Sequence, residues 1–245
     1  MMTDLKNQVV IVTGASDGLG KGLAIRLAKE GARLALVARN EEKIKAVAAE
    51  ISQSGAEVKY FVCDLTSVEQ IQKTVAEIKA AYGTVDVLIN NAGIWSPGDL
   101  ISHTVEKIQQ LFATNALGTI FMTREVLPIL KEKHNGQILN VTSIAGVETV
   151  PAYGLIYTAT KHAVKGFTDT LKLEAQNYGV KVMGFYPGGM ATHIAAAAGI
   201  DMPSDPNLMM KVEDVAEFLT FILKQPKDVW FDHFEVRKFS EPKAS

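Results

Sequence analysis

Short runs of β-branched and other apolar residues alternate along the chain with longer segments of helical periodicity. Most of the runs are nearly continuously apolar, which is typical of parallel strands that are covered on both faces. The longer segments carry apolar residues three and four positions apart. This alternation predicts an α/β fold, a Rossmann-like doubly wound parallel β-sheet with helices on both faces. The expected strands are Val9–Thr13, Leu34–Ala38, Val58–Val62, Val85–Asn90, Ile138–Thr142, Val182–Tyr186 and Val229–Val236, and the expected helices are Leu19–Lys29, Glu41–Ser54, Val68–Ala81, Val105–Lys133, Ile156–Gln176 and Val212–Leu223.

The 245 residues suit one domain with a large core, and no internal repeat or low-complexity tract divides them. We therefore expect residues 1–245 to form a single Rossmann-type domain. Pro128 lies inside a long helical pattern and is expected to kink or shorten that helix. The stretch from Pro187 to Asn207 is rich in proline, glycine and small residues, which indicates an irregular surface loop with a short helix.

The charge balance argues against several classes of partner. The formal net charge is -2 and no Lys/Arg-rich block occurs, so neither nucleic acid nor an anionic membrane is expected. No apolar run reaches about 18 residues and the first residues lack a secretory pattern, so neither a spanning helix nor a signal peptide is predicted. The single cysteine, Cys63, follows an apolar run, which indicates a buried thiol in a reducing, cytoplasmic setting. The histidines show no metal-ligand spacing, so no metal is expected.

A glycine-rich turn joins the first expected strand to the first expected helix, in the order Thr13-Gly14-Ala15-Ser16-Asp17-Gly18-Leu19-Gly20. Glycines at such a turn let a pyrophosphate approach backbone N–H groups at the positive end of the helix dipole. The spacing G-x-x-x-G-x-G differs from the general dinucleotide fingerprint, but the physical logic is the same. A turn that needs glycine for packing alone is the competing explanation. We predict a dinucleotide site.

The end of the second expected strand bears on which nicotinamide cofactor binds. NAD enzymes place a carboxylate there for the ribose hydroxyls, whereas NADP enzymes place an arginine for the extra phosphate. Arg39 stands at this point, and a guanidinium can pair with a phosphate through two parallel hydrogen bonds. A solvated arginine at the start of a surface helix is the alternative. Asp17 in the glycine turn opposes the assignment, because a carboxylate there could repel the phosphate. We predict NADP rather than NAD.

Two further motifs follow expected strands, at the edge where ligands bind in open α/β sheets. Asp64 follows the third strand and could accept a bond from the adenine amino group or cap the helix that begins near Ser67. The run Asn90-Asn91-Ala92-Gly93 follows the fourth strand. Its amides are better suited to stabilising the sheet and contacting a cofactor than to a plain turn.

Tyr157 and Lys161 lie four residues apart in a helical pattern, so their side chains share one face. A free tyrosine has a pKa of about 10, and lowering it by three units requires about 4 kcal/mol of preferential phenolate stabilisation. One ammonium about 4 Å away supplies roughly that much at an effective dielectric near 20. We therefore expect Lys161 to lower the pKa of Tyr157 and make it a proton donor and acceptor.

Taken in order, these motifs resemble those of the short-chain dehydrogenase/reductase family, in its one-domain branch, over essentially the full length. The motifs that carry the resemblance are Thr13-Gly14-x-x-x-Gly18-x-Gly20, Asp64-Leu65, Asn90-Asn91-Ala92-Gly93, Asn115, Ser143-Ile144-Ala145-Gly146, Tyr157-x-x-x-Lys161 and Pro187-Gly188-x-x-x-Thr192. The resemblance implies an NAD(P)-dependent enzyme that acts on CH–OH groups. It implies a small carbonyl or alcohol substrate, and a homodimer or homotetramer is expected.

The resemblance also implies a role for each matching residue. Tyr157 would exchange the proton, Ser143 would hold the carbonyl oxygen, Lys161 would contact the nicotinamide ribose, and Asn115 would anchor a water that links Lys161 to solvent. The predicted catalytic residues are thus Asn115, Ser143, Tyr157 and Lys161. The predicted cofactor-binding residues are Gly14, Ser16, Gly18, Leu19, Gly20, Arg39, Asp64, Asn91, Tyr157, Lys161, Pro187, Gly188 and Thr192. A substrate loop is expected at about residues 188–208, where Met190, Ile200 and Met202 suggest an apolar pocket.

The chain departs from the family pattern in two places. One extra residue separates Ser143 from Tyr157 and must be absorbed near Tyr153-Gly154. The segment Phe231–Arg237 is aromatic and charged where many relatives are glycine-rich. Two other functions compete with a carbonyl reductase: a non-catalytic NADP-binding redox sensor and a sugar-nucleotide epimerase. The complete Tyr/Lys/Ser/Asn set argues against the sensor, and the lack of a larger carboxyl-terminal domain argues against the epimerase.

Overall fold

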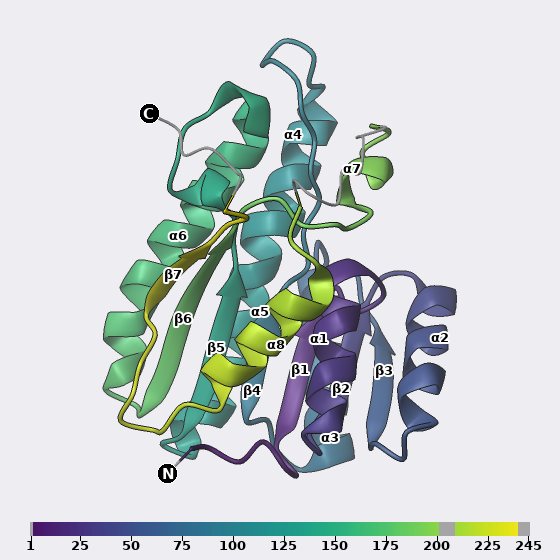
Figure 1. The fold of residues 1–245 in the computed structure, drawn as a ribbon, viewed down its shortest axis with the longest axis vertical. Coiled ribbons are helices and arrows are strands. Elements are labelled where there is room, and N and C mark those ends of the chain that lie inside the picture. The colour runs from purple at the N-terminus through teal and green to yellow at the C-terminus, as the bar shows by residue number, and fades with distance from the viewer. Residues whose placement is uncertain (1, 201–208, 240–245) are drawn as a thin grey trace.

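The computed structural model describes residues 2–200 and 209–239 and contains one parallel sheet of seven strands (Figure 1). The strand order is β3-β2-β1-β4-β5-β6-β7, so the chain winds outward in one direction from β1 and then, from β4, in the other. The carboxyl ends of β1 and β4 flank this switch point, which is where open α/β sheets bind ligands. The strands are β1 (Val9–Thr13), β2 (Arg33–Ala38), β3 (Val58–Val62), β4 (Val87–Asn90), β5 (Gly136–Val141), β6 (Val180–Pro187) and β7 (His233–Val236).

Helices cover both faces of the sheet, and each layer has its own apolar core. One core lies under α1 (Gly18–Lys29), α2 (Glu41–Ser52) and α8 (Val212–Leu223). The other lies under α3 (Val68–Tyr82), α5 (Gly118–Glu132) and α6 (Leu155–Gln176). Because β1 faces both cores, all five of its residues are buried. The predicted doubly wound sheet is therefore confirmed.

The long helix expected over Val105–Lys133 is broken, but not where the sequence suggests. Helix α4 (Val105–Phe112) leads into a π-helical turn at Ala113–Leu117, and α5 then continues past Pro128. The helix is therefore not shortened at Pro128, where the sequence suggests a kink or an end. The extra residue of a π turn shifts the side chains that follow it around the helix axis, and such turns are frequent at functional sites. Here the turn contains Asn115, which is 1% exposed.

The segment after β6 begins one residue later than expected, because Pro187 belongs to the strand. A backbone bridge joins Met190 to Met210, so the two ends of the loop lie together. The short helix α7 (Ile194–Ala197) matches the expected short helix. Met202 and the rest of residues 201–208 lie outside the described residues.

Three smaller expectations can also be compared with the structure. The carboxyl-terminal strand forms only at His233–Val236, and β4 begins at Val87 instead of Val85. Cys63 is buried, and burial raises the pKa of its thiol, as expected for an inert cysteine. Within the described residues, no helix is long and apolar enough to cross a bilayer.

Candidate active site

The glycine turn lies between β1 and α1 at the carboxyl edge of the sheet. Gly14 and Gly18 have positive φ angles of 65° and 51°, which favour glycine. A Cβ on Gly20 would lie 2.3 Å from the Gly14 carbonyl oxygen, so only glycine fits where the helix passes the turn. Asp17 caps α1 by accepting a 2.7 Å hydrogen bond from the Gly18 N–H. The predicted turn geometry is present, with the first turn of α1 directed at the switch point.

Asn91 holds the end of β4 against the glycine turn. Its side-chain Nδ2 donates to the carbonyl oxygens of Thr13 at 3.0 Å and Gly14 at 3.3 Å. The Thr13 hydroxyl accepts from the backbone N–H groups of Asn91 and Ala92. Asn90 instead points into the core and donates to Asn140 Oδ1 and Thr123 Oγ1, each at 2.9 Å. The two asparagines thus link neighbouring strands and order the turn.

Asp64 and Arg39 lie at the carboxyl ends of β3 and β2. The helix α3 is capped by Ser67, which accepts from Gln70 N, so the alternative in which Asp64 caps this helix is wrong. Asp64 Oδ1 instead accepts from the N–H and hydroxyl of Thr66, each at 2.9 Å. Arg39 is exposed, and within residues 2–200 and 209–239 its guanidinium makes no hydrogen bond or ion pair. Its donors are available for an anion.

The π turn places Asn115 between the end of β4 and helix α6. Its Oδ1 accepts from Ile94 N at 2.8 Å, and its Nδ2 donates to Ile94 O at 2.9 Å and to Thr160 Oγ1 at 3.1 Å. Thr160 directly precedes Lys161, so Asn115 ties the loop after β4 to the turn of α6 that carries the lysine. The expected water relay through Asn115 stays a prediction.

Ser143, Tyr157 and Lys161 come together beside the carboxyl end of β5. The hydroxyl of Tyr157 forms a hydrogen bond with Ser143. Lys161 is 5% exposed, its Nζ donates to the Val141 carbonyl at 3.3 Å, and it lies 5.6 Å from the Tyr157 ring centroid. A Cβ on Gly93 would approach Lys161 Nζ to 3.6 Å and Asn115 Oδ1 to 3.5 Å. The structure therefore brings together the four predicted catalytic residues.

The electrostatics of this cluster differ from the sequence-based expectation. Burial raises the pKa of Tyr157 to about 12, and the hydrogen bond with Ser143 only partly opposes it. Burial also lowers the pKa of Lys161 to about 8. The expected lowering of the phenol pKa by Lys161 is therefore not met. The amine lies against the ring, 5.6 Å from its centroid, and it is itself easier to deprotonate than a free lysine.

The loop after β6 reaches over the glycine turn. Gly188 N donates to the Val236 carbonyl at 2.9 Å, which fixes the start of the loop against β7. A Cβ on Gly18 would lie 3.3 Å from the Thr192 side chain, so Thr192 packs on the turn. His193 Nδ1 lies 3.0 Å from Asp17 Oδ1. Pro187, Gly188 and Thr192 are thus at the same edge as the other predicted cofactor residues.

The model of the short chain dehydrogenase family matches residues 8–202. The chain belongs to this family. It is accordingly an NAD(P)-dependent oxidoreductase that acts on CH–OH groups. Among curated proteins it is similar to an uncharacterized oxidoreductase of Staphylococcus aureus, with 34% identity over 96% of this chain and 99% of that protein.

Solved structures agree with this assignment. The fold is similar to the alcohol dehydrogenase of the archaeon Thermococcus sibiricus complexed with 5-hydroxy-NADP, with a TM-score of 0.90, 28% identity and coverage of 98% of this chain and 100% of that one. It is also similar to a metagenomic short-chain oxidoreductase in complex with NADP, with a TM-score of 0.84, 30% identity and the same coverage.

Two features of this short-chain dehydrogenase were missed by sequence reasoning. Trp95 follows the Asn90–Gly93 motif, and its Nε1 donates to the Tyr153 carbonyl at 2.8 Å. A Cβ on Gly154, where φ is 86°, would lie 2.7 Å from Ser96 O, so the two loops are in close contact. A tryptophan beside a strand-end motif was the one available signal. The two loops therefore meet at the start of α6, the helix that carries Tyr157.

The second missed feature connects the two places where the sequence departs from its relatives. Arg237 donates to Glu148 Oε1 at 2.6 Å and to Glu148 Oε2 at 3.1 Å. Glu235 also accepts from Arg237, at 2.8 Å, and the Arg237 side chain is only 9% exposed. The sequence gives no local signal of the pair, because Arg237 and Glu148 lie 89 residues apart. The charged end of β7 therefore holds the loop between Ser143 and Tyr157.

Proposed function

We propose that this short-chain dehydrogenase interconverts a carbonyl and a secondary alcohol with NADP, and that Tyr157 is the general acid and base. The observation that carries the proposal is the cluster of Ser143, Tyr157 and Lys161 beside the glycine turn. Tyr157 is hydrogen-bonded to Ser143, and within the described residues Lys161 Nζ donates one hydrogen bond, to the Val141 carbonyl. The two hydroxyls can hydrogen-bond the oxygen of a carbonyl or alcohol substrate, and the remaining N–H donors of the buried amine can bind a ribose beside it.

The residues present fit a nicotinamide cofactor. Gly14, Gly18 and Gly20 would hold the pyrophosphate at the first turn of α1, and Lys161 has remaining N–H donors for ribose hydroxyls. Pro187, Gly188 and Thr192 would contact the nicotinamide end. The cofactor supplies the hydride when it is bound, and the protein orients the reactants and handles the proton.

The proton chemistry follows from the two perturbed groups. With a pKa of about 12, Tyr157 is protonated near neutral pH and can donate its proton to the oxygen of a carbonyl. Ser143 would bond the same oxygen and keep it within reach of the phenol. In the reverse direction Tyr157 must act as a base, which its raised pKa disfavours until positive charge is brought close to the phenol.

Activity tests this proposal directly. Tyr157→Phe should abolish NADPH-dependent reduction of every carbonyl in a panel that the parent reduces, while cofactor binding by calorimetry changes little. Tyr60→Phe in β3 is the matched control and should keep parental turnover, because Tyr60 lies in a different part of the sheet. Near-parental turnover in Tyr157→Phe would refute the catalytic assignment. Carbonyl reduction by the parent, and its loss in the variant, separate an enzyme from a redox sensor.

The preference for NADP is supported by the available guanidinium of Arg39 at the end of β2. Two similar structures contain NADP or its 5-hydroxy derivative. Loss of a charged hydrogen bond costs about 1.5–3 kcal/mol, so Arg39→Ala should weaken NADP binding roughly ten- to a hundredfold. NAD binding should hardly change. Equal affinities of the parent for NADP and NAD would contradict the proposal.

We also propose a cytoplasmic homodimer or homotetramer that acts on small, apolar carbonyl or alcohol substrates. The buried, free thiol of Cys63 and the apolar Met190 beside the site support this. Exposed apolar side chains on α4 and α6, Val105 at 64% and Leu173 at 66%, favour subunit contacts. Sedimentation equilibrium of the purified protein measures the assembly, and a monomer would contradict it.

A further inference from the structure

Asp17 presents a charge problem for a chain that binds NADP. It lies in the glycine turn with its side chain 41% exposed, beside Ser16, which is one of the predicted cofactor-binding residues. A phosphate dianion brought to this turn would meet a carboxylate, and like charges at close range are unfavourable. The chain must therefore supply local positive charge beyond what Arg39 alone provides, or accept weaker binding.

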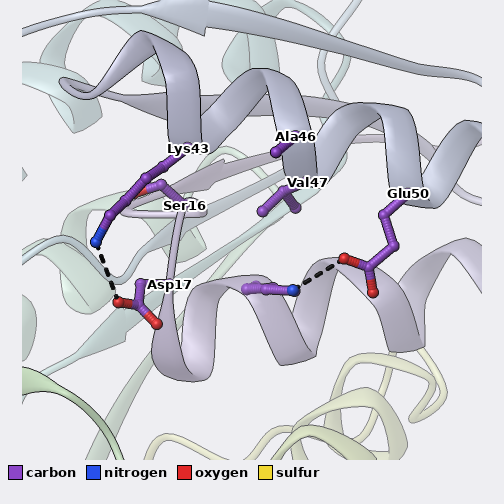
Figure 2. Close-up of a pocket in the computed structure, with 7 residues that line it drawn as sticks. Ser16, Asp17, Lys43, Ala46, Val47 and Glu50 are labelled. Atoms are coloured by element: carbon purple, nitrogen blue, oxygen red, sulfur yellow. Dashed lines mark ion pairs between the residues drawn. The ribbon is translucent and has the colours of Figure 1, made fainter.

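The structure places such a charge directly against Asp17. Figure 2 shows the Lys43 side chain reaching from α2 toward the glycine turn, where its Nζ lies 3.8 Å from Asp17 Oδ2. Lys43 is the third residue of α2, and Asn40, which caps that helix, directly follows Arg39. Arg39 and Lys43 therefore both lie where β2 leads into α2, at the carboxyl edge of the sheet, and Lys43 reaches the glycine turn.

Helix stability does not account for a lysine at this position. A cation in the first turn of a helix opposes the macrodipole, which favours Glu41 and Glu42 there. A pair separated by 3.8 Å whose lysine is 61% exposed also contributes little to folding. Neither packing nor capping requires the charge of Lys43, so its extension toward the glycine turn needs another explanation.

Asp17 can release Lys43 without losing its other partners. It accepts from Gly18 N at 2.7 Å, and His193 Nδ1 lies 3.0 Å from the same oxygen. Partial burial tends to raise the pKa of Asp17, but the His193 and Gly18 hydrogen bonds and the Lys43 charge outweigh it and lower that pKa. The carboxylate would stay hydrogen-bonded when the lysine turns to another anion.

We propose that Lys43 is a second cationic ligand for the 2′-phosphate of NADP, and that Asp17 holds its amine over the glycine turn until the phosphate arrives. Asp17 is then the opposing charge that limits NADP affinity, and Lys43 offsets it. The cleft between α1 and α2 has a second lysine, Lys21, which pairs at 2.9 Å with Glu50, farther along the two helices. That pair serves as an internal control. This inference rests on the proposed preference for NADP.

Calorimetric titration of the full chain tests the inference without any measurement of turnover. Lys43→Gln should weaken binding of NADP⁺ and of adenosine 2′,5′-bisphosphate about tenfold, while NAD⁺ and ADP bind as to the parent. Lys21→Gln should change none of the four affinities. Asp17→Asn keeps an oxygen for the Gly18 N–H and should tighten NADP⁺ binding several-fold with NAD⁺ unchanged.

The outcomes distinguish this inference from the proposed function. If Arg39→Ala selectively weakens NADP⁺ but Lys43→Gln does not, Lys43 is only a surface ion-pair partner and the inference fails alone. If neither variant discriminates between NADP⁺ and NAD⁺, the NADP preference itself fails. Weaker NADP⁺ binding in Asp17→Asn would overturn the role of Asp17 as the opposing charge.

Discussion

Replacing Lys161 with methionine should stabilise the folded protein near neutral pH. Lys161 is 5% exposed, and burial lowers its pKa from 10.5 to about 8. At about 1.4 kcal/mol per pH unit, this lowering represents about 3 kcal/mol of disfavoured charge in the folded state. Methionine has a similar length and no charge, so it removes that cost while it fills the same space.

The pH dependence gives this prediction its sign. Because the unfolded chain holds the Lys161 proton more tightly, stability rises with pH between the folded and unfolded pKa values. The destabilisation is complete below about pH 8 and is relieved as the pH approaches about 10.5. From about pH 6.5 to about pH 9.5 the parent should gain about 2 kcal/mol relative to Lys161→Met.

Urea unfolding of the cofactor-free protein, followed by tryptophan fluorescence at several pH values, measures this difference. The control is Lys73→Met, because that lysine is 74% exposed on its side chain and its replacement should give no pH-dependent gap. We expect Lys161→Met to lack turnover although it is more stable. A stability gap that does not change with pH, or a variant less stable than the parent throughout, would refute the reasoning.

Two further predictions concern packing and charge. Glu148→Gln should destabilise the fold by about 2 kcal/mol in urea unfolding, because the nearly buried Arg237 would then have only Glu235 as an ion-pair partner. In the control Glu57→Gln, loss of the more exposed pair with Arg33 should cost under about 1 kcal/mol. Equal losses in the two variants would contradict this prediction. Gly20→Ala should weaken cofactor binding at least tenfold and lower the stability of the fold, because the new Cβ would lie 2.3 Å from a backbone oxygen. The control is Gly166→Ala in α6, where a Cβ meets open space, and it should stabilise the fold by about 0.5–1 kcal/mol. Parental cofactor affinity in Gly20→Ala would show that the turn can move aside.

Much of the fold was predictable because burial leaves a local record in the sequence. A strand covered on both faces must be apolar at successive positions, and the sequence predicts Val9–Thr13, all of whose residues are buried, with its observed bounds. The glycine turn was predictable for a similar reason, since the backbone at Gly14 and Gly18 adopts positive φ angles that glycine favours. Part of the candidate site was predictable because the glycine turn, Asp64 and the Asn90–Gly93 run each follow a strand whose end lies at the same edge of the sheet.

The sequence alone was sufficient to specify the layered sheet, its helices and the residues that gather at its carboxyl edge. How those residues interact depends on tertiary packing. That packing placed the helix break at Asn115 and not at Pro128, paired Arg237 with Glu148, and partly buried Tyr157 so that its pKa rises. Local periodicity reports whether a position is buried. Pair contacts, π turns and desolvation depend on which distant segments pack together, and no local pattern records that choice.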